Sequence, residues 1–299
     1  MIRGLLPVDL LVAAFNAAMA CVWAAAAWGV GEPRVAGAPW LSAAHAVAAA
    51  LPWVLRDARW LRARAHPLLR EAYPLLGIVL FWAELGFLAR VRALPAHDAQ
   101  IAAWDRSLFG VHLHAVWGPA APWPWLRESM YFFYFSYYLM LVIPALVILA
   151  RGRRDAIRDV TLRLMATYLT CFLFYAVFPV HGPRAIDPVQ VPPHRAALFE
   201  SLVESARATG DSPGTAFPSS HVAGVVTVAW FGRRWFGRWA ASILAAGALL
   251  VTLATVYTGN HFAIDALAGA AWGIAVQALL VPALARPAGA QGSPLNRSA

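Results

Sequence analysis

The sequence predicts an all-α integral membrane protein with about eight transmembrane helices. Hydrophobic residues make up 61% of the chain and charged residues only 13%, whereas a soluble domain carries about 25% charged residues. The mean hydropathy is +0.59. A helical span needs about 20 apolar residues, and several stretches reach or approach this length. They are residues 8–30, 38–55, 73–89, 127–149, 161–179, 219–231, 239–257 and 262–282.

The first stretch could be mistaken for a signal peptide, because it follows the basic start Met1-Ile2-Arg3. It is longer than a signal-peptide core and lacks a clear cleavage site of small residues, so we interpret it as a retained span. The expected organisation is then two extra N-terminal spans with a basic loop (residues 1–70), a six-helix catalytic membrane domain (71–285) and a polar tail (286–299). The composition of this tail predicts disorder.

Arginine sets the predicted orientation. All 24 basic residues are arginine, and they are densest in the gaps 56–70, 151–158 and 233–238. By the positive-inside rule these gaps face the cytoplasm. This assignment alternates through all the spans and places both termini in the cytoplasm. It also explains the net charge of +9 without nucleic-acid binding, which would need a basic face on a soluble fold.

Two long loops, residues 90–126 and 180–218, then fall on the outer side. The first contains several tryptophans of the kind that lie at membrane interfaces, together with Asp105, His112 and His114, and we interpret it as a lid or membrane-skimming segment. In the second loop, residues 196–208 predict a short surface helix.

His261 and Asp265 stand at the start of the last span, four residues apart. On a helix they would share one face. A carboxylate there can fix the tautomer of the imidazole and make its other nitrogen a better nucleophile or base. Alone the pair is weak evidence, since the same spacing also suits a polar contact between two helices.

A second histidine motif, Pro218-Ser219-Ser220-His221, opens the sixth span. Proline suits the first helical position, and the amides of a first helical turn attract anions. An ordinary helix cap with a bystander histidine would look similar.

Arg184 follows the fifth span and offers bidentate contact to phosphate, although a lone arginine also suits headgroup anchoring. The predicted topology places Arg184, His221 and His261 at one membrane face. A cation, two imidazoles and the carboxylate of Asp265 are the parts that phosphoryl transfer needs.

These motifs resemble a known family. Residues 217–221 (Phe-Pro-Ser-Ser-His) and 258–265 (Thr-Gly-Asn-His-Phe-Ala-Ile-Asp) resemble motifs two and three of the type 2 phosphatidic acid phosphatase superfamily, and Gly182-Pro183-Arg184 resembles the end of motif one. Residues 105–110 (Asp-Arg-Ser-Leu-Phe-Gly) further resemble the bacterial branch related to inositol phosphorylceramide synthase. The resemblance covers about residues 70–282.

The resemblance implies a phosphohistidine mechanism. His261 would be the nucleophile, Asp265 would orient it, and His221 would protonate the leaving oxygen. Arg184 would hold the phosphate, helped by amides near Ser219 and Ser220. No metal or other cofactor would be required. The substrate would be a lipid phosphate or phosphodiester at the outer face of a bacterial inner membrane, with the oligomeric state left open.

The chain lacks two cationic residues that the motifs of this family contain. Val177 stands where motif one has lysine, and Ala254-Thr255 stand where motif three has Ser-Arg. A phosphate monoester carries close to two negative charges and a diester one. A phosphate-binding clamp with fewer cations therefore favours a diester substrate, and with it transfer of a phospho-headgroup in the manner of an inositol-phosphotransferase. The alternative is a phosphatase that acts on lipid phosphate monoesters. Four arginines could replace the missing charge: Arg106, Arg127, Arg195 and Arg207.

Glu84 supports another class, a transporter or channel, because an ionisable residue inside a span usually has a function. No paired pattern of broken helices accompanies it, so the alternative is a hydrogen-bonded residue between helices. A haloperoxidase is disfavoured by the missing cations and the membrane setting. Gly269 and Gly273 predict a close helix contact on the last span.

Overall fold

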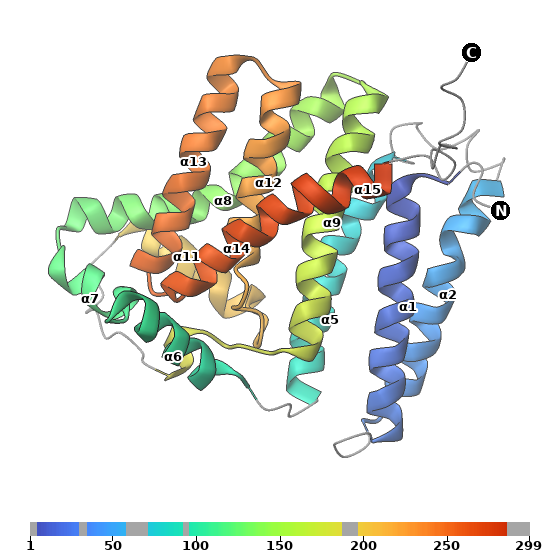
Figure 1. Ribbon diagram of the computed structural model, residues 1–299, viewed down its shortest axis with the longest axis horizontal. Helices are drawn as coiled ribbons and strands as arrows, with labels where there is room; N and C mark the ends of the chain where they lie inside the picture. The colour runs from blue at the N-terminus through green and yellow to red at the C-terminus, as the bar shows by residue number, and fades with distance from the viewer. Residues whose placement is uncertain (1–4, 30–34, 58–70, 92–95, 187–196, 286–299) are drawn as a thin grey trace, which may run out of the picture.

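The computed structural model describes residues 5–29, 35–57, 71–91, 96–186 and 197–285, and within these ranges the chain forms helices joined by turns (Figure 1). Several of the helices are long and apolar enough to cross a membrane. They are α1 (Pro7–Trp28), η1 with α5 (Tyr73–Leu75 and Leu76–Val91), α8 (Pro124–Ala150), α9 (Arg154–Val177), α13 (Arg238–Tyr257), and α14 with η2 and α15 (Ala263–Ala275, Val276–Leu280 and Val281–Ala285). The prediction of a helical membrane protein is thereby confirmed.

The other two predicted spans are also helices, α2 (Ala38–Asp57) and α12 (Ser220–Trp235), but they are not among the six helices that qualify by length and composition. The 16 residues of α12 rise about 24 Å, less than the about 30 Å of a hydrocarbon core. The count of eight spans therefore stays a prediction. The tail 286–299, predicted to be disordered, lies outside the described residues.

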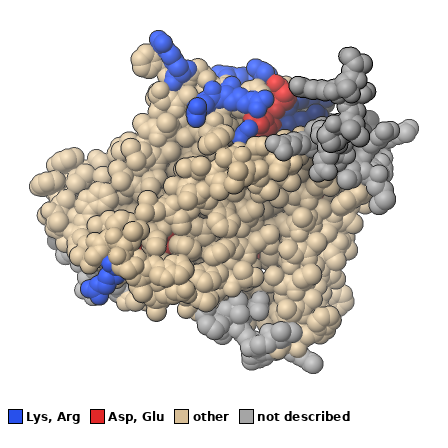
Figure 2. Space-filling model, viewed as in Figure 1, with Lys and Arg blue, Asp and Glu red and all other residues tan. Residues whose placement is uncertain are grey.

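Arginine-rich turns lie together at one end of the molecule. The turns from α8 to α9 and from α12 to α13 stand at the top of Figure 1, and Figure 2 shows basic side chains gathered at that edge. These exposed residues are Arg151, Arg153, Arg154, Arg158, Arg233, Arg234 and Arg238. Because α9 and α13 start at this end and α12 finishes there, the histidine motifs lie at the other end. Residues 58–70, which hold most of the third arginine cluster, are outside the described ranges.

Helix α9 is the centre of the bundle. Most of its side chains are buried, and it packs against α1, α5 and α12. A buried polar network fastens it to the last helix: Arg163 donates to Gln277 (3.0 Å), whose amide donates to Thr167 and Thr227 (3.0 and 3.1 Å). Such a satisfied network specifies one packing arrangement of the helices.

Glu84 on α5 joins the two N-terminal helices to the rest. Its carboxylate accepts the indole N–H of Trp23 on α1 and lies 2.6 Å from Nε2 of His45 on α2. His45 in turn contacts Asn16 at 2.8 Å. The interpretation of Glu84 as a hydrogen-bonded interhelical residue is confirmed, and the main observation in favour of a transporter thereby has a structural explanation.

The two long loops carry short helices of their own. Residues 90–126 contain α6 (Asp98–Phe109) and α7 (Leu113–Ala120), and the predicted surface helix is present as α11 (Leu198–Gly210). In Figure 1, α6 and α7 lie at the end opposite the arginine-rich turns, where α6 contacts α14 and the short α10 (Pro183–Ile186).

The glycines of α14 touch α12, as their spacing predicts. A Cβ atom at Gly269 would lie 2.4 Å from the carbonyl oxygen of Ser219, and one at Gly273 would lie 3.0 Å from that of Ala223. Only glycine permits this backbone approach, which sets the distance between the two histidine motifs.

Candidate active site

His261 lies in the turn between α13 and α14. Its amide and that of Asn260 both donate to the carbonyl of Thr255 (3.0 and 3.1 Å). Helix α14 begins at Ala263 with Phe262 as its N-cap, so the prediction that His261 and Asp265 share one helical face is wrong. The tight turn brings them together instead: Nδ1 of His261 is 3.4 Å from Oδ2 of Asp265.

Asp265 is fully buried, and its Oδ2 also accepts the amide of Phe262 at 2.9 Å. The carboxylate therefore binds the first turn of its own helix while facing Nδ1 of His261. This leaves Nε2 as the nitrogen of His261 that can react, because the other nitrogen is turned towards the carboxylate.

Ser219 connects the two histidine motifs. It is the N-cap of α12, where its Oγ accepts the amide of Val222 (3.3 Å) and lies 3.2 Å from Nε2 of His261. Its own amide donates to the carbonyl of Asp265 at 3.0 Å. Pro218 precedes this cap, so the expectation that it occupies the first helical position is wrong. The amides of Ser220 and His221 begin the helix at its positive end.

The imidazole of His221 stands beside that of His261. The ring centroids are 5.7 Å apart and the planes meet at 62°. The other side of His221 is covered by Tyr134 and Tyr137, whose ring centroids lie 5.4 and 4.3 Å away. The two imidazoles thus lie next to each other with their planes inclined.

Asp98 shapes the segment that carries Arg184. One oxygen of Asp98 accepts the amides of His181 and Gly182, both at 2.8 Å, and the other lies 2.9 Å from Nδ1 of His181. Gly182 has a φ of 93°, a conformation that favours glycine. The guanidinium of Arg184 is held by the carbonyls of Gly259 (3.2 Å) and Thr258 (2.9 Å). This fastens it to the turn before His261.

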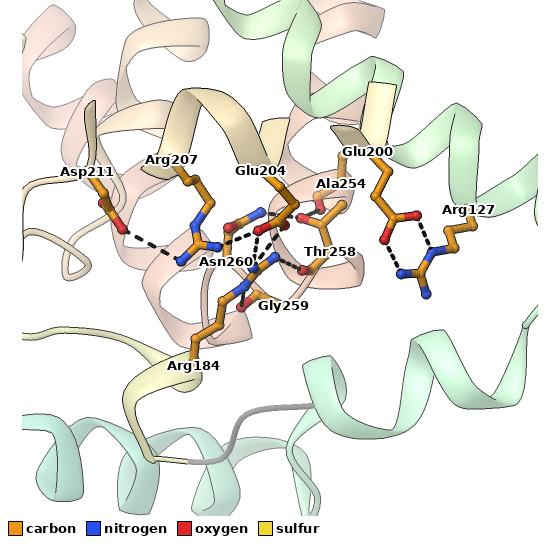
Figure 3. A network of polar contacts seen from close by, with 10 residues as sticks. All are labelled: Arg127, Arg184, Glu200, Glu204, Arg207, Asp211, Ala254, Thr258, Gly259 and Asn260. Carbon is orange, nitrogen blue, oxygen red and sulfur yellow. Dashed lines mark hydrogen bonds and ion pairs between the residues drawn. The ribbon is translucent and has the colours of Figure 1, made fainter. Parts of the chain in front are cut away.

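Helix α11 supplies a carboxylate between two arginines (Figure 3). Glu204 accepts from Nη1 of Arg184 at 2.9 and 3.0 Å and from Nη1 of Arg207 at 2.7 Å. Arg207 also lies 3.7 Å from Asp211. Of the four arginines that could replace the missing cations, three lie in the part of the chain that the structure describes, and among those three Arg207 is the one that shares a carboxylate with Arg184.

A cavity of about 70 Å³ lies between the arginines and the two histidine motifs. Its walls include His181, Arg184, Arg207, His221 and His261. Its charged lining residues are the two arginines and one carboxylate, Asp211, while Glu204 pairs with both arginines from outside the lining.

A larger cavity of about 270 Å³ lies on the other side of Arg184 and Glu204. It contains Arg127, which forms a bidentate pair with Glu200. Arg127 is therefore in a different cavity from His221 and His261. Arg106 is exposed on α6, and Arg195 lies outside the described residues.

The structure brings together all the predicted site residues, which come from three segments of the chain. They are Arg184, Ser219, Ser220, His221, His261 and Asp265. Sequence reasoning missed His181 and Glu204. His181 could have been suspected from its place three residues before Arg184. Nothing in the sequence indicated that α11 would aim a carboxylate at that arginine.

The family comparison covers this region of the chain. A family model described as PAP2 superfamily matches residues 99–279, a range that contains every one of these residues. Searches among curated proteins and among solved structures give no significant match.

Proposed function

Because this chain belongs to the PAP2 superfamily, whose members are typically phosphatases or phosphotransferases, we propose that it transfers a phospho-headgroup from a phosphodiester lipid to an alcohol acceptor. The supporting observation is one cavity that receives two imidazoles beside two arginines whose charge is offset by two carboxylates. The reaction would resemble that of an inositol-phosphotransferase.

In the proposed mechanism Nε2 of His261 attacks the phosphorus atom, and the bond between phosphorus and the diglyceride oxygen breaks. His221 gives its proton to that oxygen, so a neutral alcohol leaves. Asp265, 3.4 Å from Nδ1, stabilises the positive charge that develops on His261. In the second step His221 takes the proton of the acceptor hydroxyl, whose oxygen displaces His261 from the phosphorus.

The charge of the clamp favours a diester. Arg184 and Arg207 together carry two positive charges. Glu204 and Asp211 carry two negative charges and pair with these arginines, so little net positive charge is left to bind a phosphate. A diester brings one negative charge and a monoester close to two, so the monoester is poorly compensated here. A phosphatase acting on lipid phosphate monoesters is the second candidate, supported by the presence of Arg207 beside Arg184.

The proposal includes a location. If the arginine-rich turns face the cytoplasm of a bacterial cell, the cavity opens at the outer side of the inner membrane and both termini lie inside. The donor would then be drawn from the outer leaflet.

The first experiment compares substrates for the purified protein in lipid nanodiscs. One reaction receives phosphatidic acid, and the other receives phosphatidylinositol with ceramide as the acceptor. A headgroup-transfer product without rapid release of inorganic phosphate from phosphatidic acid supports the proposal. Fast release from phosphatidic acid with no transfer product would instead establish the monoester phosphatase.

The second experiment tests the intermediate. A phosphodiester donor labelled with ³²P at phosphorus should leave an acid-labile, alkali-stable label on the wild type, as expected of a phosphohistidine. His261→Ala should lose this label and at least about 10³-fold in turnover. His97→Ala is the control, because His97 stacks on Phe178 outside the cavity. Turnover retained by folded His261→Ala would exclude the mechanism.

A further inference from the structure

A second cluster of ionisable side chains lies beside the cavity of the two catalytic histidines. Asp105 stands near the end of α6, His112 is the N-cap of α7, and His114 is in its first turn. Gly110, with a φ of 76°, turns the chain between the two helices. As a result, one donor atom from each of the three side chains lies within 4.8 Å of the other two.

We propose that Asp105, His112 and His114 bind a divalent transition-metal ion, with zinc as the best match. Two imidazoles and one carboxylate form a donor set that zinc prefers, with a fourth position left for water. Nδ1 of His112 and Oδ2 of Asp105 are 3.0 Å apart. Neighbouring ligands on a tetrahedral zinc ion are about 3.3 Å apart, and the donors farthest apart need to move by less than about 1 Å to reach bonding distance.

The surroundings of Asp105 fit a metal ligand. The residue is fully buried, and its Oδ1 accepts the amide of Ile264 at 3.0 Å, which directs Oδ2 towards His112. Metal ligands are commonly oriented in this way by a second hydrogen bond. A buried carboxylate is also costly unless a positive charge compensates it, and a dication between the three side chains would do so.

The ion would position the catalytic turn without touching the phosphate. The rings of His112 and His114 pack against Phe262, with centroids 5.5 and 5.0 Å away, and Phe262 directly follows His261. The Asp105 carboxylate meanwhile holds the first turn of α14. Metal binding would therefore lock the segment formed by α6 and α7 against the start of α14. This role is independent of which lipid reacts and is compatible with metal-free phosphohistidine chemistry.

The test is the metal content of the full chain, purified without a polyhistidine tag. After equilibration with zinc and removal of the excess, mass spectrometry should find stoichiometric zinc in the wild type and little in the double variant His112→Ala/His114→Ala. Zinc should also raise the Tm of the chelator-treated wild type and leave that of the double variant unchanged. Equal zinc contents in the two proteins would overturn the proposal.

Two further variants keep the test decisive. His97→Ala removes a histidine next to α6 that is outside the cluster, and it should bind zinc as the wild type does. Asp105→Asn keeps an oxygen that can accept the amide of Ile264 and removes the charge, so it tests metal binding even if the double variant fails to fold. Its zinc affinity should fall at least about tenfold. An affinity equal to that of the wild type would show that the cluster is not a metal site.

Discussion

The carboxylate of Glu204 lies 2.9 Å from Nη1 of Arg184, in the position that a phosphate oxygen would take on a guanidinium. In the proposed reaction, a substrate phosphate would replace Glu204 on Arg184. A monoanionic phosphodiester can exchange for one carboxylate without changing the net charge of the cavity, whereas a dianion adds a second negative charge.

Glu204→Gln should therefore change substrate preference. Removing one negative charge should raise kcat/KM for phosphatidic acid relative to a phosphodiester roughly fivefold, or about 1 kcal/mol for a charge on a partly exposed side chain. Competition between the two lipids in one nanodisc preparation measures this ratio directly. Glu200→Gln is the matched control, because Glu200 lies on the same helix and pairs with Arg127 in the other cavity. Glu200→Gln should leave the ratio unchanged. An equal shift in both variants would show that Glu204 does not influence phosphate binding at Arg184.

His221→Gln should discriminate between leaving groups. A donor with an alkoxide leaving group needs the proton of His221 and should lose about 10²–10⁴-fold in turnover. A p-nitrophenyl phosphodiester, whose leaving group is stable as an anion, should lose less than about tenfold. Parallel assays of the wild type and the variant on both donors give the answer. Equal losses would mean that His221 serves the site in some way other than proton donation.

Two substitutions of Ser219 separate its contacts. Ser219→Ala and Ser219→Gly both remove the hydroxyl that lies 3.2 Å from His261, and both should lower kcat about tenfold with little change in KM, because a misoriented nucleophile reacts slowly. Only alanine should also cost about 1 kcal/mol of stability, since glycine is tolerated at an N-cap. If the loss in kcat is larger in the variant with the lower thermal stability, Ser219 acts only as a helix cap.

Gly269→Ala should destabilise the protein by about 2 kcal/mol or more, because the new Cβ would meet the backbone of Ser219 at 2.4 Å and neither helix can yield without moving its neighbours. Gly247→Ala is the matched control. Its Cβ would meet only the flexible side chain of Met140, at 2.9 Å from Sδ. Thermal unfolding in one detergent compares the two, and similar Tm values would contradict the packing argument.

Much of the site was predictable because sequence motifs and arginine clusters are local signals. Arginine clusters predict the orientation of the spans, and that orientation places Arg184, His221 and His261 at one end. The predicted starts of two helices were wrong. His261 and Pro218 both precede their helices, since the caps at Phe262 and Ser219 depend on hydrogen bonds to side chains and turns that periodicity does not reveal.

Contacts between distant segments could not be predicted from the sequence. Glu204 pairs with Arg184 only because α11 folds back over the cavity, and Asp98 holds His181 across 83 residues of chain. Each contact needs the relative placement of two loops, which follows from packing and not from a local pattern. The spacing of Gly269 and Gly273 predicted a close helix contact, but not that α12 would be the partner.

The shortness of α12 has a consequence for how a lipid would reach His221. With its arginine end at one surface, a helix that rises about 24 Å stops about 6 Å below the opposite edge of the hydrocarbon layer. A donor would then only have to lower its phosphate, while its acyl chains stay among neighbouring lipids. No methylene group, each worth about 0.8 kcal/mol, need enter water. An amphiphilic alcohol that diffuses in the same leaflet would then reach the proposed intermediate on His261 from within the membrane.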